Sequence, residues 1–299
     1  MSKLVEGEVA PRSGAPDSAP SLAVQFFLIP LAVVAVLVSL YAGFRMMVAD
    51  QRTAQDYLNE LRTGGRQRQW PAAYELSRLL ADQEVEQREP ELGGALVRAF
   101  QESAGSDPRV RRYLAMAIGQ LQVPPAETIP ALLGATGDAD SETVINVIWA
   151  LGSLEARSAV APLQQLYGSA DAGIRKMVVY TLGALPDDGQ LRTLRTALND
   201  TAVDVQWNAA VALARHGDPG GVDVLRRMLD REYVERAVSR TPRGDVEPDP
   251  VADVMISGIR AASALRAATL REPVLELSRE DHSLRVRQAA IEALKEIGT

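Results

Sequence analysis

One ten-residue pattern recurs along this chain and constrains how it can fold. It reads IRKMVVYTLG at 174–183, VRRYLAMAIG at 110–119, VQWNAAVALA at 205–214 and VRQAAIEALK at 286–295. In each copy, apolar or small residues fall on one face at helical spacing. Consecutive copies begin at residues 110, 143, 174 and 205, which gives steps of 33, 31 and 31. A nearly constant step of this size predicts a stack of supersecondary units.

The residues between the copies indicate a second helix in each unit. The recurring helix comes second, and the helix before it carries a proline near its start, at Pro130, Pro162 and Pro273. Aspartates at the turns before the recurring helices suit N-caps, at Asp107, Asp140, Asp171 and Asp281. No convincing β alternation follows residue 53, so the sequence predicts an all-α fold.

Composition and charge exclude several classes of function. Aromatic residues make up only 5% of the chain, which suits close-packed helices better than a β-sandwich. The formal charge of −7 and the pI near 5.1 argue against a nucleic-acid partner, because phosphate binding needs a basic face. The chain has no cysteine, which excludes disulfides and thiolate chemistry.

The recurring frame, Val-Arg followed by alanines, leucine and glycine after an aspartate turn, resembles HEAT repeats. The match is to the short bacterial form, including PBS-lyase HEAT-like repeats. It covers roughly residues 67–298 in six or seven helix pairs. The frame departs from the pattern at Thr143-Val144 and again near Ser257. The resemblance implies an α-solenoid, in which the second-position arginines bond an aspartate in an adjacent turn as a structural ladder. These arginines are Arg111, Arg175 and Arg287.

The N-terminal region has a different character from the repeats. Residues 1–20 are rich in Gly, Pro, Ser and Ala, and we expect them to be disordered. Residues 21–44 carry no formal charge, and at about 1.5 Å per residue they are long enough for a single transmembrane helix. A cleaved signal peptide is the alternative, but it fits poorly because the apolar run is long and no basic segment precedes it.

Flanking charge gives the expected orientation of this span. Lys3 and Arg12 precede it, whereas Arg45 and Arg52 follow it closely. The positive-inside rule therefore favours the cytoplasm for the C-terminal side, with the protein in the bacterial inner membrane. Residues 45–66 are expected to form a juxtamembrane helix and hinge, and residues 67–299 the solenoid.

An insertion interrupts the repeats. The step between the frames near 205 and 257 grows to about 52, and the extra residues fall at 231–250, between two helices of one unit. Its first part is basic, with Arg236, Arg240 and Arg243. Long loops inside compact repeats are either tolerated or functional, so the insertion is either a solvated loop or a partner-specific contact.

No motif in the sequence supports catalysis. His216 and His282 lie in turns of different units and lack metal-ligand spacing, so both are expected at the surface or as caps. No nucleophile arrangement or phosphate-binding glycine loop is found in the sequence. We therefore predict that the protein is not an enzyme and that it binds no cofactor or metal.

A candidate binding surface follows from the frame itself. If positions 1, 5, 8 and 9 face the core, positions 3, 4 and 7 face the concave side. The alternative is that side chains at position 7 pack against the second helix of a neighbouring unit. This packing is favoured for Trp149 and Tyr180, which stand at position 7. Trp207, at position 3, is therefore the better surface candidate. Exposed aromatic and apolar residues are typical of binding sites. The candidate residues are Tyr113, Met116, Ile145, Trp149, Met177, Tyr180, Trp207 and Val211, with Arg236, Arg240 and Arg243 added by the insertion.

These observations predict a non-catalytic, membrane-anchored scaffold or accessory subunit. It would hold a protein partner within or beside a membrane protein complex, with residues 21–44 in the lipid bilayer. The alternative, implied by the same resemblance, is a tetrapyrrole lyase-like or chaperone-like protein that acts on a partner protein. A spacer without a dedicated partner is a third possibility.

Overall fold

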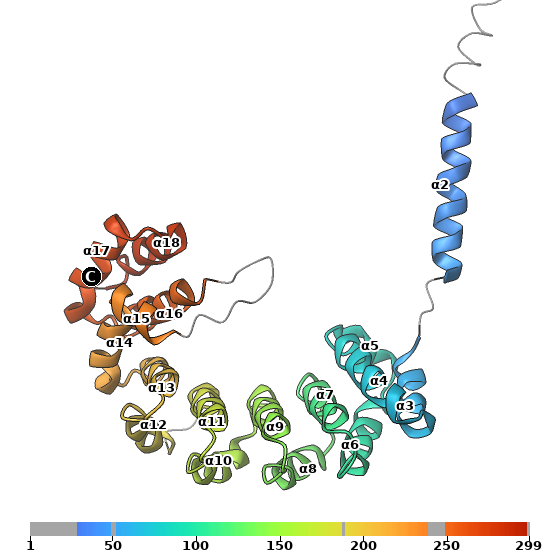
Figure 1. Ribbon diagram of the computed structural model, residues 1–299, viewed down its shortest axis with the longest axis horizontal. Coiled ribbons are helices and arrows are strands. Elements are labelled where there is room, and N and C mark those ends of the chain that lie inside the picture. The colour runs from blue at the N-terminus through green and yellow to red at the C-terminus, as the bar shows by residue number, and fades with distance from the viewer. Residues whose placement is uncertain (1–28, 49–51, 187–188, 239–248, 298–299) are drawn as a thin grey trace, which may run out of the picture. The chain divides into compact units, whose positions relative to one another are not determined.

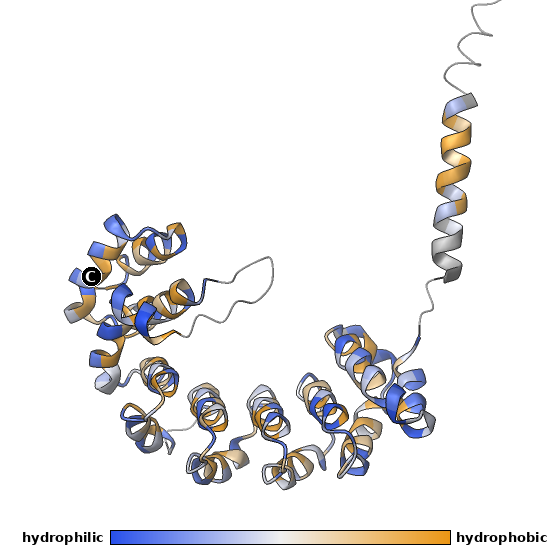
Figure 2. Cartoon of the chain, viewed as in Figure 1, coloured by the Kyte–Doolittle hydropathy of each residue, from blue (hydrophilic) through white to orange (hydrophobic). Residues whose placement is uncertain are grey.

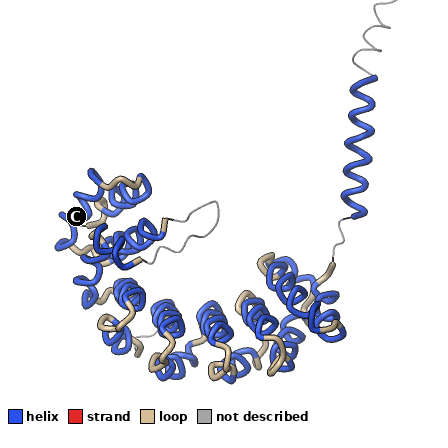
Figure 3. The backbone as a smooth tube through the Cα atoms, in the orientation of Figure 1, coloured by secondary structure: helices blue, strands red, loops and turns tan. Residues whose placement is uncertain are grey.

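A computed structural model of the chain describes residues 29–48, 52–186, 189–238 and 249–297. Within these ranges the chain forms seventeen α-helices, short 3-10 turns and no strand (Figure 3). It divides into two compact units, Met1–Arg52 and Thr53–Thr299. The all-α prediction is therefore confirmed for the described residues.

The first unit contains one described helix, α2 (Ile29–Val48). Its apolar residues colour most of its first half orange in Figure 2. The predicted transmembrane helix covered residues 21–44, and residues 21–28 lie outside the described part, as does the predicted tail at 1–20. Among the described residues, the structure has no helix with the length and apolar character needed to cross a bilayer. The prediction of a membrane span therefore gains no support from the structure.

The second unit is a helical solenoid of stacked pairs (Figure 1). One helix of each pair lies on the inner side of the curve and forms what we call the inner row; its partners form the outer row. The inner row comprises α4 (Arg66–Leu79), α7 (Pro108–Ile118), α9 (Ser141–Ser153), α11 (Ala172–Ala184), α13 (Val203–Arg215), α16 (Pro250–Ala264) and α18 (Leu284–Ala293).

The outer row supplies the first helix of each pair. Its members are α3 (Ala54–Thr63), α6 (Leu92–Glu102), α8 (Thr128–Gly134), α10 (Val160–Leu166), α12 (Leu191–Ala197), α14 (Val222–Met228) and α17 (Arg271–Glu280). Two further short helices belong to neither row: α5 (Gln83–Arg88) lies between the first two pairs, and α15 (Arg231–Ala237) lies between the two helices of the pair α14 and α16. Solenoid stability is approximately a sum of units and of interfaces between neighbours. Six pairs lie within the predicted range of 67–299, and α3 with α4 makes a seventh among the described residues.

Local signals set the helix boundaries. The Asp140 carboxylate accepts a hydrogen bond from the Thr143 backbone N–H at 2.8 Å, and Asp171 accepts one from Gly173 at 2.7 Å. These bonds satisfy amide groups that the first helical turn leaves without a partner. The three outer-row prolines each occupy the third residue of their helix, within the first turn, as in α8 with Pro130.

The glycine that ends the frame allows adjacent inner-row helices to approach closely. A Cβ atom at Gly119 would lie 2.6 Å from Cζ3 of Trp149, and one at Gly152 would lie 2.9 Å from Cγ2 of Thr181. Such distances are too short for a real side chain. Glycine is required here by packing and not by backbone conformation.

Ion pairs link successive units, as the resemblance implied. Arg175 in α11 donates to both carboxylate oxygens of Asp200, at 2.9 and 2.8 Å, and Arg111 pairs with Asp138 at 2.7 Å. The hydrogen bond from Arg175 lowers the pKa of Asp200 to about 2. Arg287 differs, because it donates to the backbone carbonyl of Asp281 at 2.9 Å.

The first part of the insertion is helical. Arg231, the first residue of α15, pairs with Asp281 at 2.7 Å, across 50 residues of sequence. Burial would raise the pKa of Asp281, but the hydrogen bonds from Arg231 and from the Ser283 backbone hold it below its ordinary value. This pair therefore ties the insertion to the last helix pair. Residues 239–248, which include Arg240 and Arg243, lie outside the described part.

The solenoid begins earlier in the chain than the sequence suggested. Helix α3 packs on α4, and its residues Leu58 and Leu61 are buried. Thr53 caps α3 with a reciprocal capping box to Asp56. Of residues 45–66, predicted to form a juxtamembrane helix and hinge, Ala54–Thr63 form the outer helix of the first pair.

Candidate binding groove

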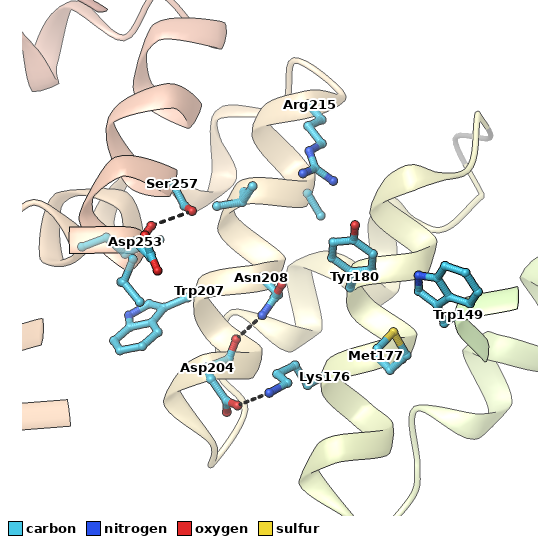
Figure 4. A pocket seen from close by; sticks show the side chains of 14 residues that line it. Trp149, Lys176, Met177, Tyr180, Asp204, Trp207, Asn208, Arg215, Asp253 and Ser257 are labelled. Carbon is cyan, nitrogen blue, oxygen red and sulfur yellow. Dashed lines mark hydrogen bonds and ion pairs between the residues drawn. The ribbon is translucent and has the colours of Figure 1, made fainter. Parts of the chain in front are cut away.

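A cavity of about 540 Å³ opens on the inner row, between α9, α11, α13 and α16 (Figure 4). Apolar and aromatic side chains line most of it. Five of the residues predicted from frame positions 3, 4 and 7 meet here, and they are Trp149, Met177, Tyr180, Trp207 and Val211. We call this cavity, with its continuation along α16 and α18, the groove.

Tyr180 is more accessible than the packing alternative suggested, whereas Trp149 packs against the preceding inner-row helix, as that alternative has it. Tyr180 is 44% exposed, and Trp149 is half-buried with its six-membered ring over Gly119. Both side chains stand on consecutive inner-row helices and face the cavity in Figure 4. Both residues therefore present aromatic surface to a ligand.

Trp207 is more buried than expected. It was the better surface candidate, yet only 7% of its surface is exposed, so this expectation is wrong. The side chain belongs to the same buried cluster as Met228 and Met255, from the pair that follows. Its indole N–H has no hydrogen-bond acceptor among the described residues. A buried donor without an acceptor costs about 1–3 kcal/mol.

The remaining inner-row candidates lie outside the cavity. Tyr113 makes an edge-to-face contact with Tyr74, with ring centroids 5.2 Å apart. Ile145 and Met116 are half-buried on α9 and α7. The sequence reasoning missed Tyr74, which is 38% exposed on α4, because the first unit departs from the frame. Aromatic side chains thus continue beyond the cavity to α4, at the N-terminal end of the inner row.

One edge of the groove carries paired charges. Lys176 pairs with Asp204 at 3.3 Å, and Asn208 donates to the Asp204 backbone carbonyl at 2.7 Å. Asp253 in α16 pairs with Arg285 in α18 at 2.7 Å. These pairs join neighbouring inner-row helices along one edge of the groove.

A second cavity of about 580 Å³ continues the groove towards the C-terminus. It shares Asp253 and Ser257 with the first cavity. Sequence reasoning missed this part, because the frame is irregular near residue 257. The signal available was the spacing of exposed polar residues on α16. The other lining residues are Ile256, Arg260, Leu284, Arg285, Gln288, Ala289 and Glu292.

The other predicted residues take no part in the groove as described. Arg236 lies exposed on α15 and lines neither cavity. His216 contacts Gln190 at 3.3 Å through its ring nitrogen. In the part of the chain that the structure describes, no cluster of three or more His, Cys, Asp or Glu side chains could hold a metal ion.

The family comparison agrees with the observed pairing of helices. The model of HEAT repeats matches residues 97–179 and 161–240. Together the two matches span residues 97–240, which are similar to HEAT repeats. The groove residues from Trp149 to Arg215 lie within this segment. No curated protein is similar enough in sequence to count as a match.

Solved structures resemble the chain in fold. The complex of CpcE and CpcF of phycocyanin lyase from Nostoc sp. PCC7120 matches with a TM-score of 0.55 and 17% sequence identity, over 84% of this chain and 90% of that one. A designed armadillo repeat protein in complex with the peptide (KR)4 matches with a TM-score of 0.43 and 18% identity, over 82% and 100% of the two chains. At these identities the likeness concerns the fold alone.

Proposed function

We propose that this protein is a non-catalytic interaction module, which holds a segment of a protein partner in the groove. The observation that carries the proposal is the cavity of about 540 Å³ on the inner row, lined mainly by apolar and aromatic side chains. Concave apolar sites with a few polar groups are the usual form of binding pockets. Repeat solenoids of this type bind protein partners, as in the CpcE–CpcF complex.

The composition of the groove supports a protein ligand. Its accessible residues include Tyr180, Trp149 and Met177, and aromatic residues and methionine are enriched at protein interfaces. Large aromatic side chains in pockets supply most of the binding energy in such contacts. An apolar side chain of the partner would enter between these residues.

A photo-crosslinking amino acid at position 180 tests the proposal. Introduced in place of Tyr180 in the full-length chain, it should form a discrete covalent adduct with a partner protein in cells. The matched control places the same amino acid at Arg192, on α12 in the outer row. Adducts of equal yield from both positions, or none from position 180, would contradict the proposal.

Attachment to the membrane is a separate proposal, carried by the sequence at 21–44 alone. It places the solenoid on the cytoplasmic side of the bacterial inner membrane, beside a membrane protein complex. The full-length protein should stay in the membrane pellet after an alkaline wash, and a variant lacking residues 21–44 should be released. Release of the full-length protein would contradict attachment through this segment.

A second candidate function is favoured by one observation. The chain has the fold of the phycocyanin lyase subunits CpcE and CpcF, which supports the proposal of a lyase-like or chaperone-like protein acting on a partner. A coloured tetrapyrrole that co-purifies with the full-length protein and is lost in Met177→Glu would favour this function over simple partner binding.

A further inference from the structure

The charges in the groove are not evenly balanced between its two edges. Along the edge formed by the first turns of α13 and α16, both carboxylates are paired, Asp204 with Lys176 and Asp253 with Arg285. These pairs neutralise that edge internally. A ligand there would meet no unpaired charge from these four residues.

The opposite edge carries arginines without acidic partners. Arg215 in the last turn of α13 and Arg260 in α16 are both exposed, and neither has an acidic partner among the described residues. The Arg215 guanidinium carbon lies 5.9 Å from the ring centroid of Tyr180, which holds it at the rim of the cavity (Figure 4). Arg260 lines the second cavity. Glu292 also lines the second cavity and accepts a hydrogen bond from Gln288 at 2.7 Å. With two arginines against this one carboxylate, the arginine edge, made up of Arg215 and Arg260, keeps a net positive charge.

The charge of the arginine edge is opposite in sign to the net charge of the whole chain. The net charge is −7, so binding of an acidic ligand would depend on local contacts with arginines and not on the charge of the chain as a whole. Local complementarity of this kind fixes orientation and excludes wrong partners more than it raises affinity. Two unpaired arginines are too few for nucleic acid, whose binding depends on many phosphate contacts.

We propose that the groove selects a partner segment in which a large apolar side chain is accompanied by carboxylates. The apolar side chain would enter the cavity between Trp149, Met177 and Tyr180, while the carboxylates would pair with Arg215 and Arg260. This inference rests on the proposed function and adds the chemistry of the partner. Arginine suits the role because its fork of donors matches a carboxylate bidentately.

A library of short random peptides, displayed and selected on the full-length protein, tests the inference. Peptides are counted only if they fail to bind Met177→Glu, which places a charge in the cavity. Enriched peptides should combine a large apolar residue with a negative net charge. Selection on the double variant Arg215→Glu, Arg260→Glu should enrich positive peptides instead. For one selected acidic peptide, this double variant should bind about tenfold more weakly or worse, as expected for reversal of two exposed charge contacts.

The control variant makes the same charge change elsewhere. Arg192→Glu with Arg279→Glu alters outer-row helices α12 and α17 and should leave both selection and affinity unchanged. Groove-dependent peptides of neutral or positive charge would overturn the inference and leave the proposed function standing. Absence of any groove-dependent peptide would overturn both. A single-stranded oligonucleotide that competes with the acidic peptide at equal concentration would also overturn the choice of a protein ligand.

Discussion

Single residues decide how this solenoid responds to pH. Asp200 accepts hydrogen bonds from Arg175 and from the Tyr167 hydroxyl, the latter at 2.9 Å. Because Arg175 lowers the pKa of Asp200 to about 2 in the folded protein, the carboxylate stabilises the fold above its ordinary pKa of 3.8. This contribution is lost as pH falls through the folded value. The shift corresponds to roughly 2 kcal/mol in the free energy of unfolding.

The free energy of unfolding should depend less on pH in Asp200→Asn than in the wild type. Urea unfolding of the wild type should show the free energy of unfolding falling between about pH 4 and pH 2, and this part of the decline should be smaller by roughly 2 kcal/mol in the variant. The exposed Asp223 provides the control, since Asp223→Asn should retain the wild-type profile. If the free energy of unfolding fell equally with pH in the wild type and in Asp200→Asn, the low pKa assigned to Asp200 would be wrong.

Backbone strain is concentrated at turns after the inner-row helices. Glu155 and Arg266 have φ values of 49° and 48°, and Gly217 occupies the equivalent turn at 71°. In each turn the next N–H bonds the carbonyl five residues earlier, as Ala156 does with Leu151 at 3.0 Å. This is the Schellman arrangement, in which glycine is preferred at the left-handed position.

Glu155→Gly should therefore stabilise the protein by about 1 kcal/mol, because glycine adopts the left-handed conformation without a Cβ penalty. The reverse change, Gly217→Ala, should destabilise it by a similar amount. Thermal unfolding measures both. If Glu155→Gly lowered the melting temperature, strain at this turn would not be the dominant effect of the substitution.

Residue identity predicted some of these features and not others. The caps at Asp107, Asp140 and Asp171 were predictable because a cap depends on the residue and on the helix that follows it. Asp281 is not such a cap, because it lies two residues before Ser283, the N-cap of α18. The burial of Trp207 was not predictable, since it depends on how the next pair packs against α13 after an irregular insertion. The orientation of Tyr180 could not be decided from spacing alone, because one frame position can face either the groove or a neighbouring helix.

At the scale of the helix, packing between inner-row neighbours depends on the frame glycines. A Cβ atom at Gly183 would overlap that of Ala212 in α13 and lie 3.0 Å from its Cα. Gly183→Ala should destabilise the protein by about 1–3 kcal/mol, the usual cost of overpacking a close contact. This cost outweighs the gain in helix propensity of roughly 1 kcal/mol that alanine brings.

The matched control is Gly134→Ala at the end of α8, where nothing lies within 4 Å of the added Cβ. There, only the propensity gain of up to about 1 kcal/mol applies, so the two substitutions should change stability in opposite directions. Chemical denaturation measures both. Equal effects would show that packing at Gly183 does not decide helix spacing.

The helix pairs themselves were predictable from short-range signals. Period, proline position and aspartate caps all lie within one unit, so the sequence repeats them visibly. The position of α3 in the solenoid and the helix at the start of the insertion could not be predicted from the sequence, because both depend on contacts with other units. Arg231 reaches Asp281 across 50 residues, and no local pattern indicates such a pair.

At the scale of the whole solenoid, stability should decrease from its middle to its C-terminal end. Central pairs have two neighbours, whereas the pair of α17 and α18 has one, and nearest-neighbour interfaces supply much of the stability of repeat arrays. The end helix α18 also leaves Leu284 72% exposed and Ile291 47% exposed. At the other end, α3 buries Leu58 and Leu61.

Native-state hydrogen exchange should therefore give the slowest amide exchange in α9, α11 and α13, and faster exchange in α18 than in α4. The central helices are held by two interfaces, and of the two ends the C-terminal one leaves Leu284 and Ile291 exposed, whereas α3 covers the N-terminal one. Replacing the two exposed side chains, Leu284→Gln with Ile291→Gln, should change the free energy of unfolding by about 0.5 kcal/mol or less, as for other surface positions. Uniform protection along the solenoid, or a large loss of stability in the double variant, would mean that the C-terminal face is covered in the native protein. The groove would then end in an interface, and the arginine edge at Arg260 would lie beside it.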